Sequence, residues 1–231
     1  FPLKGFTLKW YDQMINASRL HQALFNSIKV GVTASIFSTL IALLAAKAFT
    51  KYKVRLRQLS YAAILLPFVI PEIIIAVSLI VLWTGMGLQL GLIPVTISHV
   101  LFCTPFCMLV LISRMEGFDR NLEEAAMDLG ENVWGTFWRV TFPLVLPAIV
   151  ASLLLSFVIS FDEFILAFFL TSNDQTLPLY MWGQLRFPKK LPHVLALGAV
   201  IIVATSIIVM LSYWLRNLGK PTDKKNNIGG I

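Results

Sequence analysis

The stretch RMEGFDRNLEEAAMDLGENVWGTFWRVTFP, residues Arg114–Pro143, decides how the rest of this chain is interpreted. It carries six acidic residues and three arginines, and long apolar runs lie on both sides of it. Such runs are typical of helices that cross a lipid bilayer, which need about 20 mainly apolar residues. We therefore interpret residues 114–143 as the main polar loop between two membrane spans.

Local rules predict two short helices in this loop. Asn121 is a suitable N-cap for the first, because its side-chain oxygen can accept a hydrogen bond from an unpaired backbone amide. Glu123 and Glu124 then fall in the first turn, where the helix dipole favours acids. Gly130 follows where the helix should stop, since glycine readily adopts the left-handed conformation of a C-terminal cap. Residues 132–141 are predicted to form the second helix, so the loop should be a helix-turn-helix unit.

The loop resembles the cytoplasmic EAA loop of ABC-importer permeases. That pattern is Glu-Ala-Ala, three residues, Gly, nine residues and then Ile-x-Leu-Pro, and the matching residues here are Glu124, Ala125, Ala126, Gly130, Val140, Phe142 and Pro143. Val140 replaces Ile and Phe142 replaces Leu, and both changes keep an apolar side chain. The resemblance implies a coupling helix, with Glu123 next to the motif, that docks on a cytoplasmic ATPase. The alternative is an ordinary amphipathic connector.

The composition indicates an integral membrane protein. Of the 231 residues 57% are hydrophobic and 13% charged, and the mean hydropathy is +0.77, values that argue against a soluble domain. The formal charge is +7, but the basic residues are spread over short loops and a tail, which indicates topology signals and not nucleic-acid binding. The sequence has no GxxxxGK[ST] stretch, so we expect any ATP hydrolysis to take place on a separate subunit.

Five membrane spans are predicted, at about residues 28–48, 59–83, 92–112, 143–170 and 193–215. The second should be broken near Pro67 and Pro71, because proline removes a backbone donor and kinks a helix. The positive-inside rule places the first loop and the tail in the cytoplasm through their basic residues, which are Lys47, Lys51, Lys53, Arg55, Arg57, Arg216, Lys220, Lys224 and Lys225. The outer loop has fewer, namely Arg186, Lys189 and Lys190.

The predicted organisation has three parts. Residues 1–27 form an extracytoplasmic interfacial segment, residues 28–216 the transmembrane domain, and residues 217–231 a cytoplasmic tail. Permeases of the resembled family usually begin with a further helix, so we expect a first span that precedes residue 1. The expected fold is therefore an all-α, polytopic membrane bundle of the ABC-importer (MetI-like) type with five visible spans.

Three acids fall inside predicted spans, namely Glu72, Asp162 and Glu163. A charge at such a position costs at least about 2.5 kcal/mol on insertion scales, which makes each one a candidate functional residue. No lysine or arginine lies in the same spans. Asp162 is preferred to Glu163, because adjacent positions of one helix point about 100° apart and cannot both face one channel.

Acids without a basic partner can be stabilised by a passing cation, and aromatic faces attract an ammonium group. The aromatic residues near enough in sequence or topology are Phe161, Phe164, Tyr180 and Trp182. This combination suits a polyamine pathway, with carboxylates for the amines and apolar walls for the methylenes. The alternative is that Asp162 and Glu163 lie at the membrane boundary and have no part in selectivity. His99 is expected at a depth in the membrane similar to that of Glu72 and Asp162.

Other chemistry has little support. Cys103 and Cys107 lie four positions apart in an apolar run, where both fit as small helix residues. We predict neither a disulfide nor a metal site, and no cofactor. The spans contain neither a set of metal-ligating residues at suitable spacing nor a nucleophile with a base, which argues against an intramembrane enzyme.

Several longer segments resemble spermidine/putrescine permeases of the PotC type across nearly the whole chain. They are FTLKWY (residues 6–11), PEIIIAVSLIVLW (71–83), LQLGLIPVTISHVLFCTPF (88–106) and SFVISFDEFILAFFLT (156–171). The family's acidic pair matches Asp162 and Glu163, and its Pro-acid step matches Pro71 and Glu72. The resemblance implies a bacterial inner-membrane subunit that works with a second homologous permease, two copies of an ATPase and a periplasmic polyamine-binding protein.

The predicted function is ATP-driven import of spermidine or putrescine by alternating access. Within the same class, the alternative substrate is another organic cation, a metal ion or an anion. From a different class, a channel or secondary transporter would work without ATP and without a partner for the loop.

Overall fold

The computed structural model describes residues 7–51, 57–117, 119 and 121–217, and all regular elements in these residues are helices. The first half contains α1 (Lys9–Ile15), α2 (Ser18–Lys51), α3 (Arg57–Val69), α4 (Glu72–Gly85) and α5 (Leu92–Glu116). The second half contains α6 (Asn121–Asp128), α7 (Val133–Thr136), the π-helix η1 (Phe137–Thr141), α8 (Phe142–Asp162), α9 (Ile165–Leu170), α10 (Leu177–Leu185), the 3₁₀ turn η2 (Pro188–Lys190) and α11 (Leu191–Asn217).

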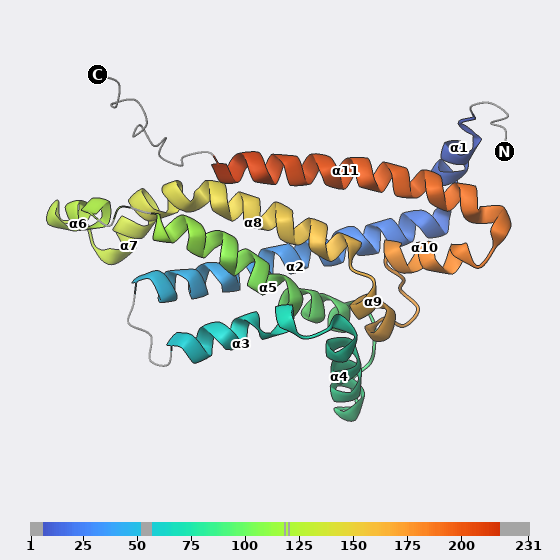
Figure 1. The fold of residues 1–231 in the computed structure, drawn as a ribbon, viewed down its shortest axis with the longest axis horizontal. Coiled ribbons are helices and arrows are strands. Elements are labelled where there is room, and N and C mark those ends of the chain that lie inside the picture. The colour runs from blue at the N-terminus through green and yellow to red at the C-terminus, as the bar shows by residue number, and fades with distance from the viewer. Residues whose placement is uncertain (1–6, 52–56, 118, 120, 218–231) are drawn as a thin grey trace, which may run out of the picture.

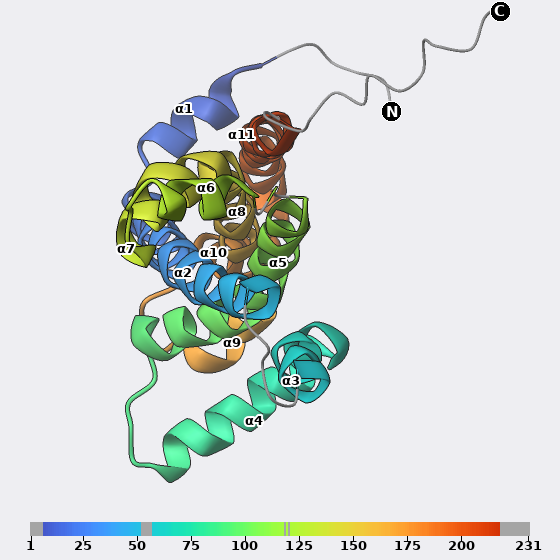
Figure 2. The ribbon, with the colours of Figure 1, turned by 90° about the vertical axis from the view of Figure 1, so that its left-hand side faces the viewer.

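The long helices α2, α5, α8 and α11 run side by side along the long axis of the molecule (Figure 1). Helices α6 and α7 lie at one end of this bundle, and α1 and α10 lie at the other (Figure 1). Seen along the bundle, α3 and α4 stand to one side of the group formed by α2, α5 and α8 (Figure 2). The polar loop is therefore separated from α1 and α10 by the length of the bundle.

Within the described residues, four helical segments are long and apolar enough to cross a membrane: 18–51, 92–116, 133–162 and 188–215. A fifth span is obtained only if the pair α3 and α4 is counted as one. The predicted break is confirmed at Pro71, whereas Pro67 lies inside α3. The break is much larger than a kink, because the two helices meet at 101°. Pro71 is in extended backbone between them, with φ −54° and ψ 130°, and its carbonyl accepts the amide of Ile74.

The predicted segment boundaries need adjustment in two places. Helix α2 begins at Ser18, so the expected boundary between residues 27 and 28 falls inside a continuous helix. The fourth span was predicted to be helical to Leu170, which is wrong, because α8 ends at Asp162 and a separate helix begins at Ile165. Of the predicted cytoplasmic cations, Lys53, Arg55, Lys220, Lys224 and Lys225 lie outside the described residues, as does almost all of the tail.

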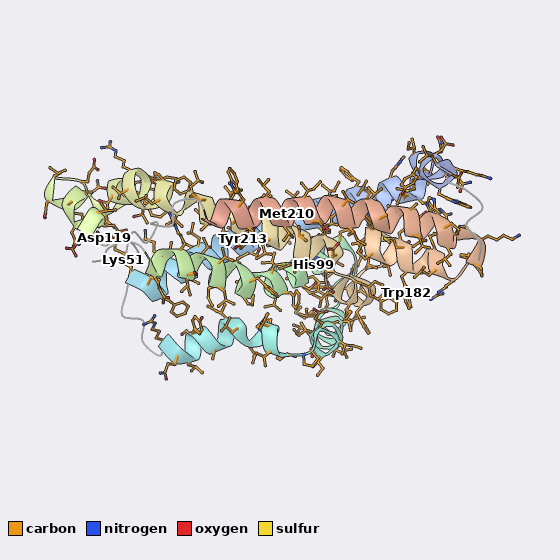
Figure 3. The ribbon with its side chains drawn as sticks, turned by 45° about the horizontal axis from the view of Figure 1, so that its top comes forward. Lys51, His99, Asp119, Trp182, Met210 and Tyr213 are labelled. Atoms are coloured by element: carbon orange, nitrogen blue, oxygen red, sulfur yellow. The ribbon has the colours of Figure 1, made fainter. Side chains whose placement is uncertain are left out.

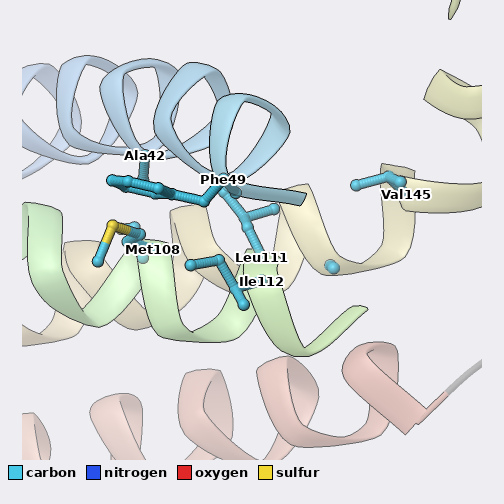
Figure 4. Packing of buried hydrophobic residues seen from close by; sticks show 9 residues of the cluster. Ala42, Phe49, Met108, Leu111, Ile112 and Val145 are labelled. Atoms are coloured by element: carbon cyan, nitrogen blue, oxygen red, sulfur yellow. The ribbon is translucent and has the colours of Figure 1, made fainter. Parts of the chain in front are cut away.

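The core lies where α2, α5 and α8 meet, and Figure 4 shows it near the loop end. Its buried members are Ala42, Ala46, Phe49, Cys107, Met108, Leu111, Ile112, Val145 and Ala148. Several of these side chains are small, which lets helix backbones approach closely in a bilayer, where association depends on packing. Large apolar residues on the outer faces of α4 and α11 remain exposed, as expected of surfaces that face lipid or another subunit.

The two cysteines act as small core residues, as predicted. Both are free and buried. The Sγ of Cys107 lies 3.7 Å from the hydroxyls of Ser38 and Thr39 on α2 and 3.7 Å from the carbonyl of Ser152 on α8. Cys107 thus links three helices through weak polar contacts.

Candidate functional sites: the loop end and the acidic region

The first helix of the loop, α6, begins at Asn121, and the side chain that caps it belongs to Asp119, two residues earlier. Asn121 was predicted to be the N-cap, which is wrong, because Asn121 is already helical and its amide donates to the Asp119 carboxylate at 3.0 Å. The Asp119 side chain therefore accepts the hydrogen bond that the Asn121 amide cannot make within the helix. The end of α6 agrees with the prediction. Gly130 has φ +93°, and the bonds from its amide to Met127 and from the Glu131 amide to Ala126 complete a Schellman cap.

The second half of the loop is continuous with a membrane span. The Asn132 side chain caps α7 by accepting the amide of Gly135 at 2.8 Å. Residues 133–141 are helical, which confirms the predicted second helix of the loop. Its separation from the next span is wrong, because α7 passes through the π-helix η1 directly into α8. The π-helical form of η1 has its physical reason at Pro143. This residue has no amide to donate, and the hydrogen-bond ladder widens just before it, where the Phe142 amide reaches the carbonyl of Phe137.

The motif side chains lie at the tip of the molecule. Glu124, Ala125, Gly130 and Pro143 are exposed, and Ala126, Val140 and Phe142 are partly buried. Around them lie exposed apolar residues, which are Leu122, Met127, Leu129, Val133, Trp134 and Trp138. Leu129 is 88% exposed and Trp134 is 70% exposed, and apolar side chains this open mark a contact surface. The loop is therefore accessible to a partner, as the resemblance implied.

Glu123 differs from its neighbour Glu124 because it points toward the bundle. Its carboxylate accepts a hydrogen bond from Lys51 Nζ at 2.7 Å and another from the Thr141 hydroxyl. Burial by itself would raise the pKa of Glu123. The hydrogen bonds from Lys51 and Thr141, together with the positive charges of Lys51 and Lys47, outweigh burial and lower this pKa below its ordinary value.

This role of Lys51 was not predicted from the sequence. Lys51 was interpreted only as a topology signal, and residues 51 and 123 are 72 positions apart. No spacing rule links them. Figure 3 places Lys51 at the loop end of the molecule and Trp182 at the opposite end.

At the acidic region, Asp162 and Glu163 do not belong to one helix. Asp162 is the last residue of α8, and Glu163 is in extended backbone with φ −68° and ψ 122°. The Glu163 Oε1 accepts the amide of Leu166 at 2.9 Å, so this buried carboxylate caps α9. Asp162 and Glu163 therefore do not point 100° apart on one helix, as was predicted, but they still have different surroundings.

Glu72 is the first residue of α4, directly after the bend. Helix α4 packs against α9 through Ile75, Ala76 and Leu166. This packing brings Glu72 within electrostatic range of Glu163. Two of the three predicted acids therefore approach each other across a helix break and a helix bend.

Asp162 is exposed and opens on an apolar pocket of about 370 Å³. Aromatic walls of this pocket come from Phe161, Phe164 and Trp182, and the rings of Phe164 and Trp182 lie 5.5 Å apart. Tyr180 does not join them. It is buried against Leu20 and Ala23 on α2, and it lines a different, polar pocket. Of the predicted aromatic residues, the structure thus brings all but Tyr180 to Asp162.

His99 lies in the interior, on α5, near the middle of the long helices in Figure 3. Its side chain is 1% exposed, and Nδ1 lies 2.7 Å from the Ser160 hydroxyl on α8. In the described part of the chain, no group of three or more His, Cys, Asp or Glu side chains is arranged to hold a metal ion.

Comparison with known proteins gives a consistent result. The family described as "Binding-protein-dependent transport system inner membrane component" matches residues 38–221. The spermidine/putrescine transport system permease protein PotC of Escherichia coli (strain K12) is 34% identical over 230 residues, which covers 99% of this chain and 85% of that protein. The putrescine transport system permease protein PotI of the same strain is 28% identical over 220 residues, covering 91% and 78% of the two chains.

A solved structure shows a similar fold. It is a bacterial alginate ABC transporter in complex with an alginate pentasaccharide-bound periplasmic protein, and the matched chain has a TM-score of 0.69 at 16% identity. The match covers 93% of this chain and 84% of that chain. This likeness concerns the fold alone.

Proposed function

Because this chain belongs to the family of binding-protein-dependent transport system inner membrane components, we propose that it moves spermidine or putrescine into a bacterial cell. The chain is a multi-pass permease subunit of an ABC importer. Relatives that are named as permeases for spermidine and putrescine match nearly its full length, and they support this substrate class.

One observation carries the substrate proposal, namely the position of Asp162 at a pocket with aromatic walls. No ion pair to Asp162 is present among the described residues, so its charge is available to a ligand. An ammonium group of a polyamine supplies the missing positive charge, and Phe161, Phe164 and Trp182 can contact it and the neighbouring methylenes. Glu72 and Glu163 would add to the negative potential further along the path.

The energy source is proposed to be a separate ATPase, present in two copies, that docks on the exposed loop. The exposed Glu124 and Ala125 and the apolar side chains around them offer the contact surface. Nucleotide-driven motion of the ATPases would move α6, and the bundle would then open alternately to the two sides. A second homologous permease and a periplasmic polyamine-binding protein complete the proposed assembly in the inner membrane.

Uptake of labelled spermidine by the complete complex in proteoliposomes tests the substrate proposal. Asp162→Asn removes the charge with little change in size, and we expect uptake at low spermidine concentration to fall at least about tenfold, the loss of a charged contact worth 1.5–3 kcal/mol. Asp174→Asn, at an exposed acid of the outer loop, serves as the control and should leave uptake unchanged. Normal uptake in Asp162→Asn would rule out a cation site at this residue.

The same assay separates the alternatives. Uptake of a different solute in place of spermidine, with the same dependence on ATP, would identify an importer of another substrate. Uptake that continues without ATP and without the ATPase would indicate a channel or a secondary transporter.

A further inference from the structure

The Glu123 carboxylate connects the loop to the bundle. Glu123 on α6 accepts hydrogen bonds from Lys51, in the last turn of α2, and from Thr141, in η1. The Lys51 and Glu123 side chains are only 29% and 13% exposed. Partial shelter from water strengthens such a pair relative to one on an open surface. Glu123 thus connects α6, η1 and α2, and its partner on α2 is 72 positions away in the sequence.

A second contact acts one turn earlier on α2. The Nζ of Lys47 lies 3.9 Å above the centre of the Phe137 ring, at the start of η1. A cation over an aromatic face is attracted by the ring. The end of α2 therefore holds both halves of the loop, α6 through Lys51 and η1 through Lys47.

Lys47 and Lys51 both belong to α2, which is the central helix of the protein. Helix α2 packs along α5 and α8 and also touches α10. At its outer half, Gly31 lies so close to α8 that a Cβ there would be 3.1 Å from the Phe157 ring. A displacement of the loop end of α2 would therefore reach the outer half of the bundle through rigid packing.

The acidic residues on α6 are divided between two faces. Glu124, in the resembled motif, is exposed, whereas Glu123 is turned inward to Lys51. We propose that Glu123 is a positioning residue that fastens the loop to α2 and η1, so that α6, η1 and the cytoplasmic end of α2 move as one body when an ATPase moves the loop. This inference rests on the proposed docking of an ATPase, and it assigns the route by which that motion enters the bundle.

The first test compares coupling in reconstituted complexes, with labelled spermidine as the probe. Glu123→Gln and Lys51→Gln should still retain the ATPase, but the spermidine taken up per ATP hydrolysed should fall about fivefold, the lower end of typical coupling between sites. The charge exchange Lys51→Glu with Glu123→Lys should restore at least half of the lost spermidine uptake per ATP hydrolysed. Recovery by exchange separates positioning by charge from a merely structural role.

The control removes another ion pair of the same loop. Arg139 pairs with Glu131, and both residues lie within the loop, so this ion pair includes no residue of α2. Arg139→Gln should therefore leave the uptake-to-hydrolysis ratio unchanged. An equal loss in Arg139→Gln and Glu123→Gln would show that the loop needs its charges in general and would overturn the inference.

A cross-link provides a second measurement that does not depend on charge. Lys51→Cys with Glu123→Cys should lose coupling before cross-linking, and a short bifunctional thiol reagent should restore it, because the two positions are proposed not to separate during the cycle. Coupling that is not restored, or a further loss of transport on cross-linking, with the ATPase still bound, would overturn the inference. Failure of the unmodified complex to bind an ATPase or to take up spermidine would instead count against the proposed function.

Discussion

The loop end and the acidic region use the same type of side chain in opposite ways. Glu123 at the loop end accepts hydrogen bonds from Lys51 and Thr141 and lies among protein charges. Asp162 in the acidic region opens on an apolar pocket and has no ion pair among the described residues. A paired acid holds two parts of the protein together, whereas an unpaired acid leaves its charge for a mobile cation. The predictions below test this contrast.

The largest effect is expected from reversing the charge of the unpaired acid. Asp162→Lys should abolish measurable spermidine uptake, with a loss of at least about a hundredfold, because two like charges 4 Å apart repel by about 4 kcal/mol at an effective dielectric constant of 20. The ATPase should remain bound, because the loop is at the other end of the bundle. Asp174→Lys is the matched control. Uptake that survives in Asp162→Lys would remove the acidic region from the pathway.

A smaller effect is expected at the end of α6. Gly130→Ala places a side chain at φ +93°, which costs about 1–2 kcal/mol, and retention of the ATPase in a pull-down should fall roughly tenfold. Gly183→Ala is the control, since a Cβ at that glycine would meet nothing within 4 Å and its backbone is helical. Full retention in Gly130→Ala would show that the shape of this turn is not needed for docking.

Glu163 provides a direct comparison with Asp162. Since the Glu163 carboxylate caps α9, Glu163→Ala should lower stability by about 1 kcal/mol, seen as a fall of about 2–4 °C in Tm. The spermidine concentration at half-maximal uptake should change less than twofold, because the buried Glu163 carboxylate adds only to the potential along the path and does not contact the polyamine. A large change in that concentration, equal to that of Asp162→Asn, would make Glu163 a binding residue and would contradict its assignment as a cap.

The smallest effect concerns pH at the loop end. Because the pKa of Glu123 is lowered in the folded protein, its contribution to stability is complete above its ordinary pKa of 4.5 and is lost as the pH falls further. Unmodified protein should have a Tm about 1–3 °C above that of Glu123→Gln at pH 6, and the difference should shrink as the pH falls below 4.5. A difference that is independent of pH would mean that the charge of Glu123 does not stabilise the fold.

Much of the architecture could be predicted from short segments. The apolar runs predicted the membrane spans, and the glycine after the acidic turn predicted the left-handed cap at Gly130. Prolines predicted a broken second span, but they did not predict the 101° angle between α3 and α4, which depends on how α4 packs against α9. The break after Asp162 was missed because every residue from Phe164 to Leu170 is apolar and fits a continuing helix.

The sequence by itself determined the class of protein, the position of its exposed loop and the presence of acids in apolar surroundings. These properties depend on hydropathy and on caps formed within a few neighbouring residues. Only the tertiary structure decided that Glu123 meets Lys51, that Glu163 caps a helix and that Asp162 faces an aromatic pocket. Such partners lie on different elements, and which of them meet is set by helix packing, which no local spacing encodes.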